Sequence, residues 1–564
     1  MLLAAGLWAT SGCDNGTTST GLEVEDSADA ANLVGGVDPA VVLQQVIKLI
    51  RTAPENPGGA NFTNAAQSLN DFFLGTRAEE FLLPESTMDF LGKHSLPPNA
   101  IESIRRPQFD GLFDGRHLDD SLLLSDVSEA ILSRGPPLQS DLAKAERLFD
   151  WVVQNIQLVP VGALAPPGAV MADGQPMQPQ ARPYDVLVRG LASEDGAQWA
   201  DRSWLFLALC RQAEIDAAYL ALVDPTIQVS PSPDVTQTEP ALTPFACAVL
   251  SEGKVYLFDA KHGFRIPGKT GAGVATFQEA DTDPAVLDRL DLPNLAYALN
   301  QSDLARCKVR VLLNATICSV APRMRLLQER LTGDDRMILY RDPVDQAAKF
   351  SQAFGGRLES VILWNLPLSV EYLLFHEGAF NEATGFAMQP FTPRWPLLRA
   401  RLLQLRGNLD DAIKAYVAFR FSHDTLDNRG EPIPRDVQGI LDIYATQFLA
   451  LAQLDKERPD EAAFLFGETL RLLPEPSPGL PFFMTFRWGA NRNLGMLLAK
   501  KGQNALAVRY LTADNPTYDA VRNRLVAQEL INQEPFAPGE EVPRPARAPK
   551  PPPTVRMDAA AKPK

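Results

Sequence analysis

The sequence is poor in the residues that build metal and redox sites. It has five cysteines and five histidines among 564 residues. The cysteines show no Cys-x-x-Cys spacing and the histidines are scattered singly, whereas structural zinc needs clustered Cys and His ligands. We therefore expect no metal and no cofactor. If Cys13 is set aside, four cysteines allow three disulfide pairings, and their spacing selects none: Cys210, Cys247, Cys307 and Cys318.

Basic residues are also in deficit. The chain has 53 Lys and Arg against 69 Asp and Glu, a formal net charge of −16. No basic cluster with interleaved aromatic residues precedes the C-terminal tail. Nucleic-acid binding depends on clustered Lys and Arg, so this composition excludes such a surface. With 45% hydrophobic residues, the chain can bury sizeable cores, and its length predicts roughly three or four domains.

The N-terminus lacks an apolar run long enough to span a bilayer. MLLAAGLWATSGC is short and ends in Ser-Gly-Cys, and no Lys or Arg occurs before Lys48. The segment resembles the end of a bacterial lipoprotein signal with Cys13 as the acylated residue, which implies an exported, lipid-anchored envelope protein. Thr10 departs from the usual Leu, and a start upstream of Met1 would explain the missing positive residues. The alternatives are an ordinary secretory signal or a buried N-terminal segment.

A central stretch, Arg182 to Asp259, predicts a helix packed on a sheet. Trp204 to Cys210 is an unbroken apolar run with polar flanks, typical of a helix buried on all sides. Phe245 to Leu250 and Val255 to Asp259 read as two strands joined across Ser-Glu-Gly-Lys, a hairpin-sized connection. The pattern predicts a core helix on a small antiparallel sheet.

These residues resemble the transglutaminase-like superfamily of papain-related cysteine enzymes. In that family a nucleophilic Cys opens the core helix, a pattern close to Ala-Leu-x-Arg-x-x-Gly-Ile follows, the next strand begins with His, and the strand after it ends with Asp. The matching residues here, with Glu214 in place of Gly, are Ala208, Leu209, Arg211 and Ile215. The resemblance covers about residues 138–264. Counting back from Arg211 by the spacing of the family puts Trp199 at the nucleophile position. Phe245 then stands at the His position and Asp259 at the Asp position.

Two of these three positions have lost the chemistry of the family. An indole cannot attack a carbonyl and a phenyl ring cannot carry a proton, whereas the reaction needs a thiolate and an imidazole. Cys247 is the alternative nucleophile. It lies two residues after Phe245, so an unbroken strand places both on one face, and His262 is its base only if the following loop folds back. The alternative is that Cys247 is a small residue of the hydrophobic core without a catalytic role.

The C-terminal part of the sequence shows a repeated helical pattern. Each of three segments follows an apolar helix and carries a small Ala for close helix crossing: Gly407 to Ala412, Arg458 to Ala463 and Gly502 to Ala507. The pattern resembles tetratricopeptide repeats, in which helix pairs stack to bury their shared faces. The spacing departs from the family's period, so a plain helical bundle is the alternative.

The predicted fold class is α+β, a transglutaminase-like core followed by an all-α helical-repeat domain. The predicted divisions are a signal segment 1–13, a flexible tether 14–37, a mostly helical region 38–135, a transglutaminase-like domain 136–300, a mixed connecting region 301–390, helical repeats 391–533 and a disordered Pro-rich tail 534–564.

The favoured hypothesis is a non-catalytic envelope lipoprotein that acts as a protein-binding or scaffold module. Its partners would be other proteins, bound through the repeats and a remnant cleft lined by Trp199, Phe245 and Asp259. No nucleic acid is expected, and membrane contact only through the lipid on Cys13. The alternatives are a cysteine peptidase or acyl-transferase that uses Cys247, and a structural part of an envelope assembly. The oligomeric state and the identity of the partner stay open.

Overall fold

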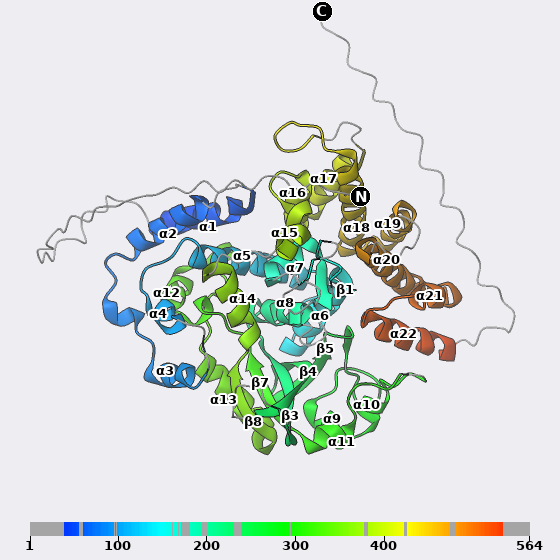
Figure 1. Cartoon of the computed structure of the whole chain (residues 1–564), viewed down its shortest axis with the longest axis horizontal. Coiled ribbons are helices and arrows are strands. Elements are labelled where there is room, and N and C mark those ends of the chain that lie inside the picture. Colours follow the sequence, from blue (N-terminus) through cyan, green and yellow to red (C-terminus); the bar gives the residue numbers. More distant parts are fainter. Residues whose placement is uncertain are drawn as a thin grey trace, which may run out of the picture.

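The computed structural model describes residues 39–55, 60–94, 96, 99–160, 162–166, 169–170, 181–194, 200–229, 239–293, 295–376, 382–421, 426–473 and 481–533. The architecture is α+β: a mixed region built around a six-stranded, mostly antiparallel sheet, followed by a run of packed helices (Figure 1).

The main sheet has the strand order β6-β5-β4-β3-β7-β8. Its strands are β3 (Asp216–Val229), β4 (Glu239–Ser251), β5 (Lys254–Asp259), β6 (Phe264–Arg265), β7 (Lys308–Leu313) and β8 (Leu358–Leu363). All neighbours are antiparallel except β7 and β8. The predicted hairpin is confirmed, because Ser251 pairs with Lys254 across Glu252 and Gly253. Both turn residues have positive φ, as in the two-residue turns that match strand twist.

Helices cover both faces of this sheet. The predicted core helix is α8 (Ala200–Gln212), which packs on β3 beside α6 (Asp141–Asn155). Residues 202–210 of α8 are all buried. The opposite face is covered by α9 (Phe277–Thr282) and α13 (Pro343–Phe354), with α10 (Ala285–Asp288) and α11 (Gln301–Arg306) alongside. The two faces belong to separate hydrophobic clusters.

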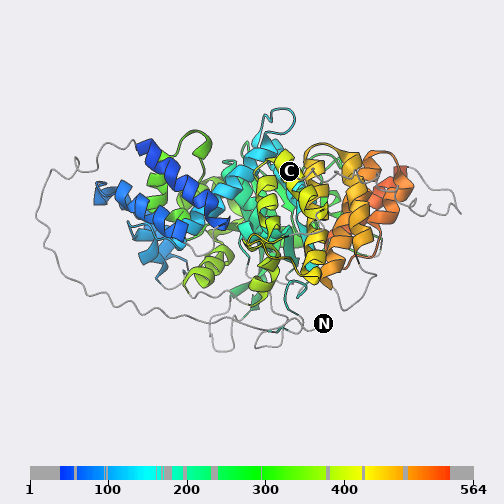
Figure 2. The ribbon, with the colours of Figure 1, turned by 90° about the horizontal axis from the view of Figure 1, so that it is seen from above.

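A third hydrophobic cluster lies around the first two described helices, which Figure 2 shows in blue at the left. It joins α1 (Pro39–Thr52) and α2 (Ala60–Phe72) to α5 (Phe113–Leu132) and α12 (Pro322–Arg330). The remaining elements of this half are α3 (Glu85–Gly92), α4 (Ala100–Arg105), α7 (Pro183–Arg189) and the parallel pair β1 (Gln157–Pro160) and β2 (Leu191–Glu194).

The apolar segment from Val361 to Phe375 is divided between a strand and a helix. Val361 to Leu363 belong to β8, and the helix α14 (Asn365–His376) follows. The β-branched residues Val361 and Ile362 pair with β7, where branched side chains fit the pleated surface. Two strands from the predicted connecting region, 301–390, thus complete the sheet.

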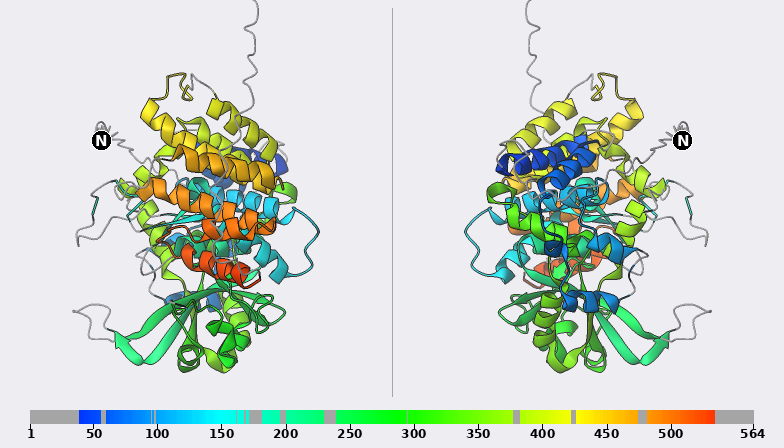
Figure 3. Two further views of the ribbon diagram at one scale, coloured as in Figure 1. Left: turned by 90° about the vertical axis from the view of Figure 1, so that its right-hand side faces the viewer. Right: turned by 90° about the vertical axis from the view of Figure 1, so that its left-hand side faces the viewer.

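The C-terminal helices form successive pairs that stack in sequence order (Figure 3). After α15 (Glu382–Met388), α16 (Pro396–Leu405) pairs with α17 (Leu409–Phe421), α18 (Arg435–Asp455) with α19 (Pro459–Leu472), and α20 (Pro481–Lys500) with α21 (Asn504–Leu511). A last helix, α22 (Asp519–Gln533), packs on α21. We call α16 to α22 the helical array.

The three pairs turn in the same way. Gly407, Glu457 and Gly502 each have positive φ at the end of the first helix. At each turn the next residue's N–H donates to the carbonyl five residues back: Asn408 to Leu403, Arg458 to Gln453, and Gln503 to Leu498. This is the Schellman arrangement of helix ends.

A fully buried Ala follows five residues after each of these positive-φ residues: Ala412, Ala462 and Ala507. The second repeat is therefore aligned on Ala462, with Glu457 in the place of Gly. The sequence-based choice of Ala463 was one residue off.

Gly190 ends α7 at the point where the array meets the mixed region. Its φ is +69°, and an added Cβ would lie 2.9 Å from a ring carbon of Phe448 on α18. Gly190→Ala should therefore cost about 1–3 kcal/mol of unfolding free energy, from backbone strain plus overpacking. Denaturant unfolding measures this value. Gly502→Ala is the matched control, because φ is +70° and its Cβ would meet nothing within 4 Å. If the two variants lose the same unfolding free energy, the close contact between position 190 and Phe448 is contradicted.

Candidate functional site

Asp259, the last residue of β5, is the centre of a buried polar group. Its Oδ2 accepts hydrogen bonds from the Tyr297 hydroxyl at 2.6 Å and from Nδ1 of His262 at 2.7 Å, and its Oδ1 accepts from the His262 backbone N–H at 3.0 Å. The chain turns tightly here, because the Gly263 N–H donates to the Asp259 carbonyl. The loop therefore folds back and places the imidazole on the carboxylate.

The electrostatics favour an ionised Asp259. Burial by itself raises the pKa of this carboxyl, but the charge of His262 and the hydrogen bonds from His262 and Tyr297 outweigh burial, so the pKa lies below its ordinary value. With Nδ1 directed at Asp259, Nε2 of His262 has no hydrogen-bond partner among the described residues. This is the arrangement in which a carboxylate orients an imidazole for proton transfer.

Cys247, the alternative nucleophile of the sequence analysis, lies in the core of the sheet. It lies on β4 opposite Phe258 and is fully buried. Burial raises the pKa of the Cys247 thiol far above its ordinary value; the charge of Asp259 adds to the rise, and a hydrogen bond with Ser203 of α8 offsets only part of it. A thiol that stays protonated is a poor nucleophile. The geometry favours the reading of Cys247 as a core residue.

Phe245 and Cys247 do not share a face of β4, so that expectation was wrong. Ala246 pairs with Leu220 and Pro244 with Ala221, which leaves Phe245 as an extra residue in a β-bulge. Phe245 lies in the hydrophobic cluster on the α9 and α13 side of the sheet, whereas Cys247 lies in the cluster on the α8 side. The bulge reverses the alternation that the sequence pattern assumes.

Two predicted site residues, Trp199 and Cys13, lie outside the described residues. The helix α8 begins at Ala200, directly after the predicted nucleophile position. Its first turn carries Arg202, which is 1% exposed. Arg202 donates to the carbonyls of Ala260 at 3.3 Å and Ile156 at 2.8 Å, so this end of α8 is tied to the residue that follows Asp259.

The last helix of the array covers this end of α8. Arg202 forms a bidentate ion pair with Asp519 of α22, at 2.7 and 3.0 Å, and Asp519 Oδ2 also accepts from Arg492 of α20 at 3.0 Å. Tyr518 packs edge-on against His262, with ring centroids 5.4 Å apart. We call the group of Asp259, His262, Tyr297, Tyr518 and Asp519 the Asp259 centre. Its carboxylate and imidazole are enclosed by the array.

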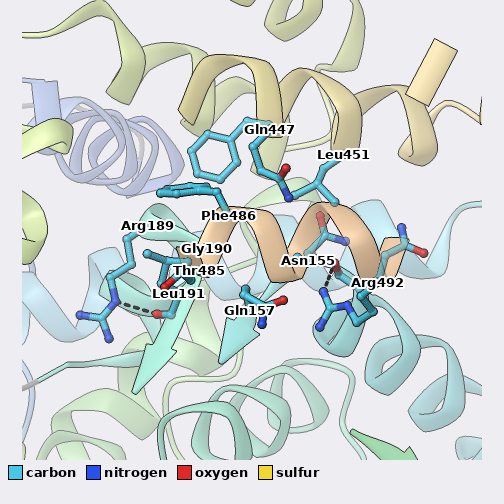
Figure 4. A pocket seen from close by; sticks show the side chains of 13 residues that line it. Asn155, Gln157, Arg189, Gly190, Leu191, Gln447, Leu451, Thr485, Phe486 and Arg492 are labelled. Carbon is cyan, nitrogen blue, oxygen red and sulfur yellow. Dashed lines mark hydrogen bonds between the residues drawn. The ribbon is translucent and has the colours of Figure 1, made fainter. Parts of the chain in front are cut away.

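The first helices of the pairs also contact the mixed region. Arg401 of α16 donates to the carbonyl of Leu187 at 2.7 Å, and Arg492 of α20 donates to that of Gln154 at 2.9 Å. Between β1, β2, α18 and α20 there is a narrow pocket (Figure 4). Arg189, on its edge, is turned to the carbonyl of Leu191. The inner side of the array is therefore largely occupied by the protein's own core.

A second group of buried charges lies on α5 and α7. Arg182, at the start of α7, forms ion pairs with Asp120 at 2.9 Å and with Asp185 at 3.0 Å. Asp119 is buried beside them and forms no ion pair with any residue that the structure describes. Burial and, to a smaller extent, the charge of Asp120 raise the pKa of Asp119 to about 8, although the nearby arginines oppose the rise. At neutral pH Asp119 is mainly protonated.

Comparison of the chain with protein-family models, with curated proteins and with solved structures finds no match in any of the three. Within the described residues, no helix is both long and apolar enough to cross a membrane, and no group of His, Cys, Asp and Glu is arranged to hold a metal ion.

Sequence reasoning missed most of the Asp259 centre. The spacing Asp259-x-x-His262-Gly263 was a usable signal, because a Gly after the His permits the positive φ of +77° that closes the turn. Tyr297 and Asp519 had no local signal, since they come from segments 38 and 260 residues further along the chain.

The ion pairs of Asp519 lead to a stability prediction. Asp519→Ala leaves two buried guanidinium groups without their counter-ion, so it should lower the free energy of unfolding by about 3–5 kcal/mol. Chemical denaturation gives the value, and hydrogen exchange should show faster exchange in α8 and α20. The control is Asp514→Ala, an exposed carboxylate, which should change stability by less than about 0.5 kcal/mol. A comparable loss in both variants would contradict this role.

Asp119 leads to a pH prediction. Its pKa is raised in the folded state, to about 8 from an ordinary value of 3.8. The folded protein therefore binds a proton that the unfolded chain releases, and this group's contribution to stability is lost as pH rises toward 8. Asp119→Asn, which mimics the protonated acid, should flatten the decline of the denaturation midpoint between pH 6 and 8.5. An unchanged decline would show that Asp119 does not cause it.

Proposed function

We propose that this chain is a non-catalytic transglutaminase-like protein that binds other proteins. The observation that carries the proposal is the Asp259 centre. An Asp–His pair is present, but Cys247, whose thiol pKa is raised by burial and by the charge of Asp259, is fully buried, and Tyr518, directly before α22, packs on His262. Acyl transfer through cysteine needs an accessible thiolate.

Three features support the transglutaminase-like assignment of the core. The helix α8 packs on β3 of an antiparallel sheet, and Asp259 ends β5 close to the first turn of that helix. Glu214, at the position where the family has Gly, has φ of +60°, a conformation that favours glycine. The backbone at Glu214 therefore has the conformation expected of the family's Gly, although the residue itself differs.

Repeat geometry supports the binding part of the proposal. Stacked helix pairs form extended surfaces suited to protein ligands. Because the first helices of the pairs are used on the protein's own core, the surface left for a partner is formed by α17, α19 and α21. Val417 on α17 and Phe464 on α19 are 38% and 41% exposed. Their helices are bridged by an ion pair of Arg420 and Glu468 at 3.6 Å. We propose this outer face as the docking surface.

An envelope location is part of the proposal, and it rests on the sequence of residues 1–13 alone. The alternative of a cysteine peptidase or acyl-transferase has no support in the burial of Cys247. The alternative of a structural part in an envelope assembly makes use of the same outer face, and it differs only in what the partner is.

Thiol alkylation tests the non-catalytic part. In the folded protein we expect Cys210, Cys247 and Cys318 to resist iodoacetamide, because each is buried and its thiol pKa is raised by burial. Peptide mapping against pH measures the rate at each site, with the urea-unfolded protein as control. Rapid modification of Cys247 with an apparent pKa well below about 8.5 would reverse the proposal in favour of an enzyme.

Paired surface variants test the binding part. Val417→Asp/Phe464→Asp should abolish retention of a partner in quantitative capture from cell-envelope extract, because a charge would be buried at the interface. Leu74→Asp is the control, since Leu74 is 80% exposed and follows α2, outside the helical array. If the Val417→Asp/Phe464→Asp protein retains a partner as well as the Leu74→Asp protein does, the docking surface lies elsewhere.

A further inference from the structure

The outer face of the array carries an exposed ring beside a glycine on α19. Phe464 is 41% exposed, and Gly467 follows it by three residues, so the two lie on one side of the helix. A Cβ added at Gly467 would meet nothing within 4 Å, so no residue that the structure describes requires a glycine there. Glycine weakens a helix interior, and its usual benefit is the close approach of another surface.

Opposite charges lie at the two ends of this face. Glu461 is in the first turn of α19 and Arg471 in the last, and both are exposed. Among the described residues, Glu461 has no hydrogen bond or ion pair. Arg471 pairs with Glu468 of its own helix at 2.9 Å, and an exposed pair of this kind contributes little stability. Both charges are therefore available to a partner.

The neighbouring helix α17 repeats this order. Asp411 lies in its first turn and Arg420 in its last, and Val417, between them, is 38% exposed. Each charge suits the dipole of its own helix. The same placement also makes the face complementary to itself when it is turned end for end.

We infer that this face binds a second copy of the chain, with the two α19 helices antiparallel across a two-fold axis. The inference rests on the docking surface of the proposed function and names its occupant. The Phe464 ring of each copy lies over Gly467 of the other, and Glu461 of each copy faces Arg471 of the other. A two-fold interface uses the same patch on both copies, so the patch must complement itself.

The spacing of these residues is consistent with one register. Placing Phe464 opposite Gly467 brings position 461 opposite position 470, which is one residue, about 1.5 Å along the helix axis, from Arg471. A parallel arrangement would instead place Glu461 beside its own copy, and like charges in contact oppose association.

Sedimentation velocity of the full chain over a concentration series tests the inference. A dimer should form, and Glu461→Arg and Arg471→Glu should each weaken it at least about tenfold, because each reversal sets like charges against one another at two symmetric places. The protein with both reversals should dimerise as the native chain does. A native chain that stays monomeric up to about 100 µM, where even weak, transient interfaces associate, would overturn the inference, and so would a double variant that does not recover.

Gly467→Gln tests the close approach. Gln is a better helix former than Gly, so the melting temperature of the monomer should stay the same or rise. The dimer should weaken at least about tenfold, because the added side chain occupies the place of the Phe464 ring. Gly439→Gln is the matched control, since Gly439 lies within α18 and a Cβ there also meets nothing within 4 Å. Equal dimerisation of the two variants would overturn the contact.

These outcomes separate the inference from the proposed function. A monomeric native chain whose capture of an envelope protein is lost in Val417→Asp/Phe464→Asp leaves the docking surface in place and overturns the second copy as its occupant. Recovery of the dimer by the charge exchange supports the second copy, and it does not depend on thiol reactivity.

Discussion

The two guanidinium groups that share Asp519 join the halves of this molecule. Arg202 belongs to α8, at the centre of the mixed region, and Arg492 and Asp519 belong to the helical array. All three side chains are at most 2% exposed. A buried carboxylate held by two arginines is stable only with its partners in place, so the position of the array on the core and the position of α8 on the sheet depend on one another.

This constraint explains why the Asp259 centre is closed. When Asp519 is seated on Arg202, the adjacent Tyr518 lies against His262, and the face of the imidazole is covered. The same seating directs the first helices of the array toward α7 and β1. The closed centre and the occupied inner side of the array are thus two results of a single docking geometry, and they leave α17, α19 and α21 as the outward surface.

Buried charge is a general feature of this acidic protein. Although the net charge is −16, the largest fully buried side chains are Arg189, Arg202, Arg401 and Arg492, and all four lie where the array meets the core. All four donate to backbone carbonyls of the mixed region.

The sequence by itself determined the local elements. The apolar run of α8, the hairpin of β4 and β5, and the paired C-terminal helices follow from hydrophobic periodicity and turn residues, which act over a few positions. The α+β class follows from their order.

What the tertiary structure decided is which of these elements meet. Asp259 was identified from sequence, but its partners His262, Tyr297 and Tyr518 were set by a tight turn and by contacts across large sequence separations. The bulge at Phe245 shifted that side chain to the other face, since one extra residue reverses the alternation of a strand. No local pattern encodes the docking of α22, because the energy of a buried ion pair exists only when both halves have folded and excluded water from it.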